Sequence, residues 1–171
     1  LSTGSGDDLI EGIGGQGIAM GGENAIIDTG AGNDVIRGEQ TGVGNFDGFQ
    51  GEGTIYTGSG NDTIDALIGD FDMAGRIDMG PGKDKVLGFY SGVDERLFTV
   101  DGGPGQDAIL GQEGVYQIER TDFGFVIMAD RLPSRIGLLS FEWIGSALSG
   151  NTVPLTEGIL TVGSNGGVTL V

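Results

Sequence analysis

Residues 3–10 read Thr3-Gly4-Ser5-Gly6-Asp7-Asp8-Leu9-Ile10, and this pattern decides the expected fold because it returns along the chain. We number its positions 1 to 8 and call positions 1–6 the turn motif. Later copies begin at Thr29, Thr57, Met79 and Gly102, and each keeps glycine at positions 2 and 4 and aspartate at position 6. Repeats spaced by about 20–50 residues indicate stacked units rather than a single irregular domain. The aspartates at position 6, here called the Asp column, are Asp8, Asp34, Asp62, Asp84 and Asp107.

Two sets of β-branched residues flank these motifs. Position 8 holds Ile10, Ile36, Ile64, Val86 and Ile109; three residues before position 2 stand Ile27, Ile55, Ile77 and Val100. β-Branched residues favour strands, and frequent glycine disfavours helix by about 1 kcal/mol per residue relative to alanine. We therefore expect an all-β chain that forms a parallel β-solenoid, with two short strands per coil of 22–28 residues.

The two halves of the chain differ. Residues 1–111 carry the motifs, so we expect calcium-binding solenoid repeats there, with variable loops at residues 12–24, 38–53, 67–75 and 88–95. Residues 112–171 lack the motif and are expected to form further coils or a cap. Strands are expected at 115–118, 124–128, 139–144 and 158–162, although Ile136, Leu139, Trp143 and Ala147 also fit a helical stripe. Aromatic residues in the loops are expected to roof the core, with sugar stacking as the alternative: Phe46, Phe49, Phe71, Phe89 and Tyr90.

Composition excludes several classes of function. The 171 residues carry 8 basic and 25 acidic side chains, a net charge of −17, which disfavours nucleic acid and anionic membranes as partners. The chain has no Cys and no His, so thiolate chemistry, a Ser–His pair and an ordinary zinc site are excluded. No apolar run approaches about 20 residues. The chain begins at Leu1 without a basic and apolar leader, so we expect a mature or excised piece.

The turn motif favours a hard cation. Glycine permits the tight turn and the close approach of neighbouring backbone, and stacking places the carboxylates of the Asp column about 5 Å apart, where they repel. Ca²⁺ takes 6–8 oxygen ligands from carboxylates and carbonyls. We expect about four ions, held by the Asp column and by the turn carbonyls near Gly4, Gly6, Gly30, Gly32, Gly58, Gly60, Gly80, Gly82, Gly103 and Gly105. The alternative is a stack of hydrogen-bonded Asx turns without metal.

These residues resemble a known family. Residues 102–110 match the pattern G-G-x-G-x-D-x-U-x of RTX, or haemolysin-type, calcium-binding repeats, and the other four copies match except at position 1. The resemblance covers about residues 2–111. It implies a right-handed parallel β-roll, calcium in the turns, and a secreted protein, usually bacterial. This chain departs from the family because one motif recurs per long coil, and because Thr or Met at position 1 weakens the case for ligation by those carbonyls.

Three functions remain open. The first is a secreted calcium-rigidified structural module of an adhesin, surface layer or filament, with end-to-end self-association as a further expectation. The second is a polysaccharide-active enzyme or carbohydrate-binding module, for which Arg76 and Arg96 are the only catalytic candidates and are better explained as partners of nearby acids. We expect no catalytic residues. The third is ice binding, which the irregular residues at positions 1 and 3 disfavour.

Overall fold

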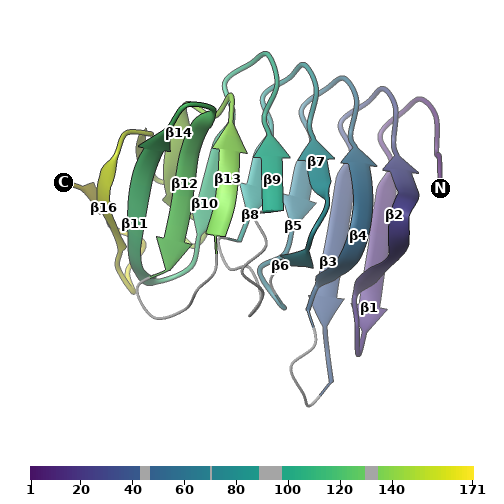
Figure 1. Cartoon of the computed structure of the whole chain (residues 1–171), viewed down its shortest axis with the longest axis horizontal. Helices are drawn as coiled ribbons and strands as arrows, with labels where there is room; N and C mark the ends of the chain where they lie inside the picture. The colour runs from purple at the N-terminus through teal and green to yellow at the C-terminus, as the bar shows by residue number, and fades with distance from the viewer. Residues whose placement is uncertain (43–46, 70, 89–97, 130–134) are drawn as a thin grey trace.

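The computed structural model describes residues 1–42, 47–69, 71–88, 98–129 and 135–171. The described chain is all-β, as expected, and contains no helix. Two sheets lie against each other, with the N-terminus at one end of the stack and the C-terminus at the other (Figure 1). The connections from β2 to β3, from β4 to β5 and from β7 to β8 follow one another along the upper edge of the view.

The first sheet has seven strands. Their spatial order is β1 (Leu9–Gly14), β3 (Val35–Gln40), β5 (Thr63–Asp65), β8 (Lys85–Leu87), β10 (Ala108–Gly111), β14 (Trp143–Ser146) and β15 (Thr152–Pro154). Each of the first five strands follows directly after a turn motif, so one strand per repeat enters this sheet.

The second sheet has ten strands in the described part of the chain, nine of them in one continuous order and β6 beside it. Their order is β17 (Val168–Leu170), β16 (Gly158–Val162), β11 (Gly114–Thr121), β12 (Gly124–Ala129), β13 (Arg135–Leu139), β9 (Phe98–Asp101), β7 (Arg76–Asp78), β4 (Phe49–Tyr56) and β2 (Ile18–Asp28), with β6 (Phe71–Met73) paired to β4.

The aliphatic columns are confirmed. The pairing is parallel from β1 to β10, and its register joins Ile10, Ile36, Ile64, Val86 and Ile109 across the first sheet. Ile27, Ile55, Ile77 and Val100 form the matching column of the second sheet. From Ile36 onward the first column is fully buried, as is the second from Ile55 onward. Both columns therefore form the core between the sheets.

The predicted parallel β-solenoid is wrong for the chain as a whole, because both sheets are mixed. Strands β11, β12, β13, β16 and β17 pair antiparallel in the second sheet, and β15 pairs antiparallel with β14 in the first. The cause is local: after residue 111 no turn motif carries the chain onward, and a tight hairpin at Thr121–Gly124 reverses its direction instead.

Smaller expectations also need correction. Residues 12–24 are not a loop, because β1 and β2 occupy most of that range. The repeat that begins at Thr57 has three strands, β5, β6 and β7, rather than two. Residues 139–144 are neither one strand nor a helix: β13 ends at Leu139 and β14 begins at Trp143. Phe49 and Phe71 lie in β4 and β6 rather than in loops, but they are buried as expected: their ring centroids are 5.2 Å apart, and that of Phe71 is 5.1 Å from that of Phe98. Phe46, Phe89 and Tyr90 lie outside the described residues.

Candidate metal site in the stacked turns

Glycine at positions 2 and 4 is required by the approach of neighbouring turns. A Cβ at Gly58 would lie 1.6 Å from the carbonyl oxygen of Gly30, and one at Gly60 would lie 1.6 Å from that of Gly32. Gly82 has no positive φ, yet a Cβ there would still lie 1.6 Å from the carbonyl oxygen of Gly60. Close packing of successive turns therefore demands glycine independently of backbone conformation.

This packing brings the whole Asp column together. Each backbone N–H in the column donates to the Oδ1 of the next aspartate: Asp8 to Asp34, Asp34 to Asp62, Asp62 to Asp84 and Asp84 to Asp107, all at 2.8 Å. The last four aspartates are at most 1% exposed. The predicted column of carboxylates is therefore present, and one oxygen of each carboxylate from Asp34 onward accepts a hydrogen bond from the preceding repeat.

The other oxygen of these carboxylates has no partner. The Oδ2 atoms of all five aspartates in the Asp column are buried, and nothing in the described part of the chain donates a hydrogen bond to them. A buried carboxylate oxygen without a donor or a cation is strongly disfavoured. The metal-free stack of Asx turns accounts for the Oδ1 atoms only and leaves this cost in every repeat.

Burial shifts the acidity of the later aspartates. Desolvation raises the pKa of Asp84 to about 7 and that of Asp107 to about 6, although the N–H groups of Asp62 and Asp84 oppose the shift by favouring the ionised forms. Neighbouring carboxylates raise both pKa values further. Desolvation also raises the pKa of Asp62, where the N–H of Asp34 opposes the shift.

Position 1 lies inside the turns and changes along the stack. The hydroxyls of Thr3, Thr29 and Thr57 donate to the position 1 carbonyl of the next repeat, at 3.2, 3.0 and 2.8 Å. The sequence already weakened the case for calcium ligation by the position 1 carbonyls. Three of them, those of Thr29, Thr57 and Met79, each accept a hydroxyl hydrogen bond. Met79 and Gly102 have no hydroxyl, so the turns of Asp84 and Asp107 lack this donor.

The glycine carbonyls predicted from the sequence to bind calcium fall into two groups, according to whether they accept a backbone N–H. Those of Gly4 and Gly30 accept N–H groups from Ala31 and Ser59, at 3.0 and 2.9 Å. The later repeats have Pro81 and Pro104 at the donor position, and proline has no N–H. Within the described residues no N–H is found to donate to the carbonyls of Gly6, Gly32, Gly58, Gly60, Gly80 and Gly103, whereas Gly82 and Gly105 pair in a β-bridge.

Sequence reasoning missed Glu142, which extends the Asp column. The N–H of Asp107 donates to Glu142 Oε2 at 2.8 Å, and the register that pairs Ala108 with Trp143 places Glu142 level with Asp107. Its turn has only Ser140 and Phe141 between β13 and Glu142, with Ser140 at a φ of 57°. No useful signal for it exists in the sequence, because Glu142 falls inside the strand expected at residues 139–144, whereas β14 begins only at Trp143.

Position 5 forms a second, exposed column. The N–H groups of Asn33, Asn61 and Lys83 donate to the side-chain oxygens of Asp7, Asn33 and Asn61, at 2.7–3.0 Å. These bonds run in the opposite sense to those of the Asp column, because here the later repeat donates to the earlier one. The two columns therefore hold each turn against both of its neighbours.

The donor set fits calcium better than it fits a transition metal. No three acidic side chains of the described residues are placed to hold a metal by themselves, so carboxylates alone would not suffice. Unpartnered carboxylate oxygens and free backbone carbonyls are both present in these turns. Ca²⁺ accepts this mixed oxygen set with irregular geometry, whereas Mg²⁺ requires a strict octahedron.

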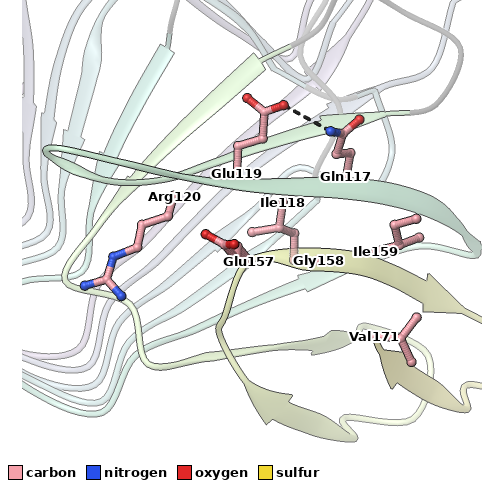
Figure 2. Close-up of a pocket in the computed structure, with 8 residues that line it drawn as sticks. All are labelled: Gln117, Ile118, Glu119, Arg120, Glu157, Gly158, Ile159 and Val171. Carbon is pink, nitrogen blue, oxygen red and sulfur yellow. Dashed lines mark hydrogen bonds between the residues drawn. The ribbon is translucent and has the colours of Figure 1, made fainter.

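The alternative sites do not assemble. Arg76 pairs with Asp78 and Asp101 at 3.1 and 2.9 Å, so its charge is matched by acids as the sequence suggested, and Arg96 lies outside the described residues. A groove of about 550 Å³ lies beside β11 and β16 (Figure 2). Glu119 and Glu157 line it, and both are exposed, so the groove desolvates neither acid.

The chain matches no family model, no curated protein and no solved structure among those compared with it. The RTX resemblance therefore rests on the repeats themselves. No helix able to cross a membrane occurs in the part of the chain that the structure describes.

Proposed function

We propose that the chain is a calcium-stabilised structural module of an extracellular protein, in which the ions lie along the Asp column. The residues that would hold them are the five aspartates and the glycine carbonyls without N–H donors. A bound divalent cation supplies positive charge to oxygens that have no other counter-charge. The chain's own part is to stack these oxygens and keep them out of water.

The observation that carries the proposal is the set of five consecutive buried Oδ2 atoms without a partner. A single buried Oδ2 without a partner would be a local irregularity. Five such oxygens in register along one edge point instead to a ligand that all five repeats share. Protonation of the aspartates is the alternative to a bound cation. It would have to hold along the whole column at neutral pH, but with a pKa of only about 6 the carboxyl of Asp107 is mostly ionised there.

The calcium affinity typical of such modules supports an extracellular location. Extracellular calcium modules work at dissociation constants of about 10⁻⁴–10⁻³ M, which cytosolic calcium would leave empty. The net charge of −17 further favours a chain that is loose without calcium and compact with it, since metal binding then supplies folding free energy. Secretion and bacterial origin are part of this proposal through the RTX resemblance.

A thermal melt in EGTA and in 10 mM CaCl₂ tests the proposal. At dissociation constants of about 10⁻⁴–10⁻³ M, each ion adds about 1.4–2.7 kcal/mol of stability, so a clear rise in Tm is expected. MgCl₂ at equal ionic strength is the control for screening. Unchanged Tm in calcium, together with no heat of binding by calorimetry, would refute calcium binding.

A further inference from the structure

The N-terminal end of the stack presents the edge strands of both sheets. β1 and β2 are the terminal strands of their sheets (Figure 1). The residues before the first turn lie along β2: Ser2 bridges Asp28 in parallel, the N–H of Asp28 donates to the carbonyl of Leu1 at 3.0 Å, and the Leu1 amine donates to the carbonyl of Ile26 at 2.8 Å. Residues 1–3 thus lie along the end of β2, and in the described structure nothing pairs with the rest of this edge.

The first turn has room for another turn above it. In later repeats a Cβ at position 2 or 4 would collide with a carbonyl of the preceding repeat, as at Gly30, 1.8 Å from the oxygen of Gly4, and at Gly32, 2.2 Å from that of Gly6. At Gly4 and Gly6 no atom lies within 4 Å of such a Cβ. Gly4 and Gly6 both have positive φ, which favours glycine whatever lies nearby. The evidence that another turn fits here is therefore the empty space beside these residues, not their identity as glycine.

Polar groups at this end lack the partners that their equivalents have. Asp8 is the one member of the Asp column whose carboxylate accepts no backbone N–H within the described residues. The N–H of Asp7 likewise has no acceptor of the kind that serves Asn33 and Asn61 in the position 5 column. An added turn in register would supply both, because its position 6 N–H faces Asp8 and its position 5 side chain faces Asp7.

The core is open at the same end. Ile27 and Ile18 retain 8% and 9% exposure, while their register partners Ile55 and Phe49 are fully buried. Ile10 is also only partly buried, in contrast to Ile36. Every interior column therefore stops at this face without an apolar residue above it.

We propose that this N-terminal face is a docking surface for one further unit of the same repeat, in parallel register. Its chemistry is specified: a strand over β2, a turn with two glycines and Asp or Asn at positions 5 and 6, and a strand over β1.

A second copy of the chain does not meet these requirements. A two-fold mate would place its β1 antiparallel to β1, which puts its motif turns at the opposite edge from Asp8. A head-to-tail copy would offer its C-terminal end, where β15 and β17 are antiparallel edge strands without a turn motif. Neither arrangement supplies an N–H to Asp8 and an acceptor to Asp7 together.

Hydrogen exchange of a tandem duplication tests the proposal. A second copy of residues 1–26 placed before Leu1 sets the new aspartate 26 residues before Asp8, the spacing between Asp8 and Asp34. We expect amide exchange in β1 and β2 to slow at least tenfold relative to the 171-residue chain, in calcium and in EGTA alike. A scrambled 26-residue extension is the matched control and should leave exchange unchanged.

Gly6→Ala provides a coupling test. In the 171-residue chain it meets only backbone strain; in the duplicated chain its Cβ would also meet a carbonyl, so it should abolish the added protection. If the duplication does not fold, a shorter extension that places residues 18–26 before Leu1 should protect β2 and leave β1 unprotected. Unchanged exchange in β2 with both extensions would overturn the proposal, as would a dimer of the 171-residue chain that protects β1 and β2.

Discussion

Replacing Asp84 with asparagine tests the electrostatics of the Asp column directly. Asp84→Asn keeps an Oδ1 able to accept the N–H of Asp62 at 2.8 Å, but it removes the charge on the buried half of the carboxylate. Asp84 is 1% exposed and its turn has Met79 rather than a hydroxyl at position 1. Burial raises the pKa of Asp84 to about 7, above the value of about 6 for Asp107.

The magnitude follows from linkage. Because the folded-state pKa is raised, the folded protein binds this proton more tightly than the unfolded chain, so stability is lost as pH rises from about 4 through about 7. The difference between 3.8 and about 7 corresponds to at most about 4 kcal/mol. The amide NH₂ introduced by asparagine needs acceptors of its own, which reduces the gain, so we expect Asp84→Asn to add about 1–3 kcal/mol in EGTA at pH 8.

Urea unfolding at pH 5 and pH 8, in EGTA and in calcium, provides the measurement. In EGTA the advantage of Asp84→Asn should shrink at pH 5, where the native carboxyl is largely protonated; in calcium it should reverse, because the variant loses a ligand charge. Asp7→Asn is the matched control, since asparagine already fills position 5 at Asn33 and Asn61. A variant less stable than the parent in EGTA at pH 8 would refute the desolvation argument.

Three further predictions concern the turns and their ends. Gly58→Ala should destabilise the protein by about 3 kcal/mol or more in urea unfolding, because its Cβ would lie 1.6 Å from the carbonyl oxygen of Gly30 at a φ of 89°. Arg37→Met should cost less than about 1 kcal/mol, and less still in 1 M NaCl, because its ion pairs with Glu11 and Asp65 are partly exposed. Glu142→Ala should cost about 1–3 kcal/mol by leaving the N–H of Asp107 unpaired, while Glu142→Gln retains the acceptor and should be no less stable than the parent at pH 8.

The sequence was informative wherever a repeat fixed both spacing and residue type. The β-branched columns and the Asp column could be predicted because each repeat must place equivalent residues above one another. Beyond residue 111 this constraint ends. The antiparallel strands depend on the hairpin at Thr121–Gly124 and on core packing between sheets, which alternation alone does not orient. Glu142 was missed because a longer side chain reaches the column from a shorter turn.

The direction of hydrogen bonding along the Asp column makes the two ends of the stack chemically different. Each aspartate N–H donates toward the C-terminal end, so the last one, at Asp107, requires an acceptor, and Glu142 supplies it just where the motif stops. The first carboxylate, at Asp8, requires a donor, and the described chain offers none. Antiparallel strands follow the satisfied end, whereas unpaired parallel strands and an open core meet the unsatisfied one. A stack built on a directional hydrogen-bond column can therefore be closed by one well-placed acceptor, and the end where donors are missing is the end at which it can grow.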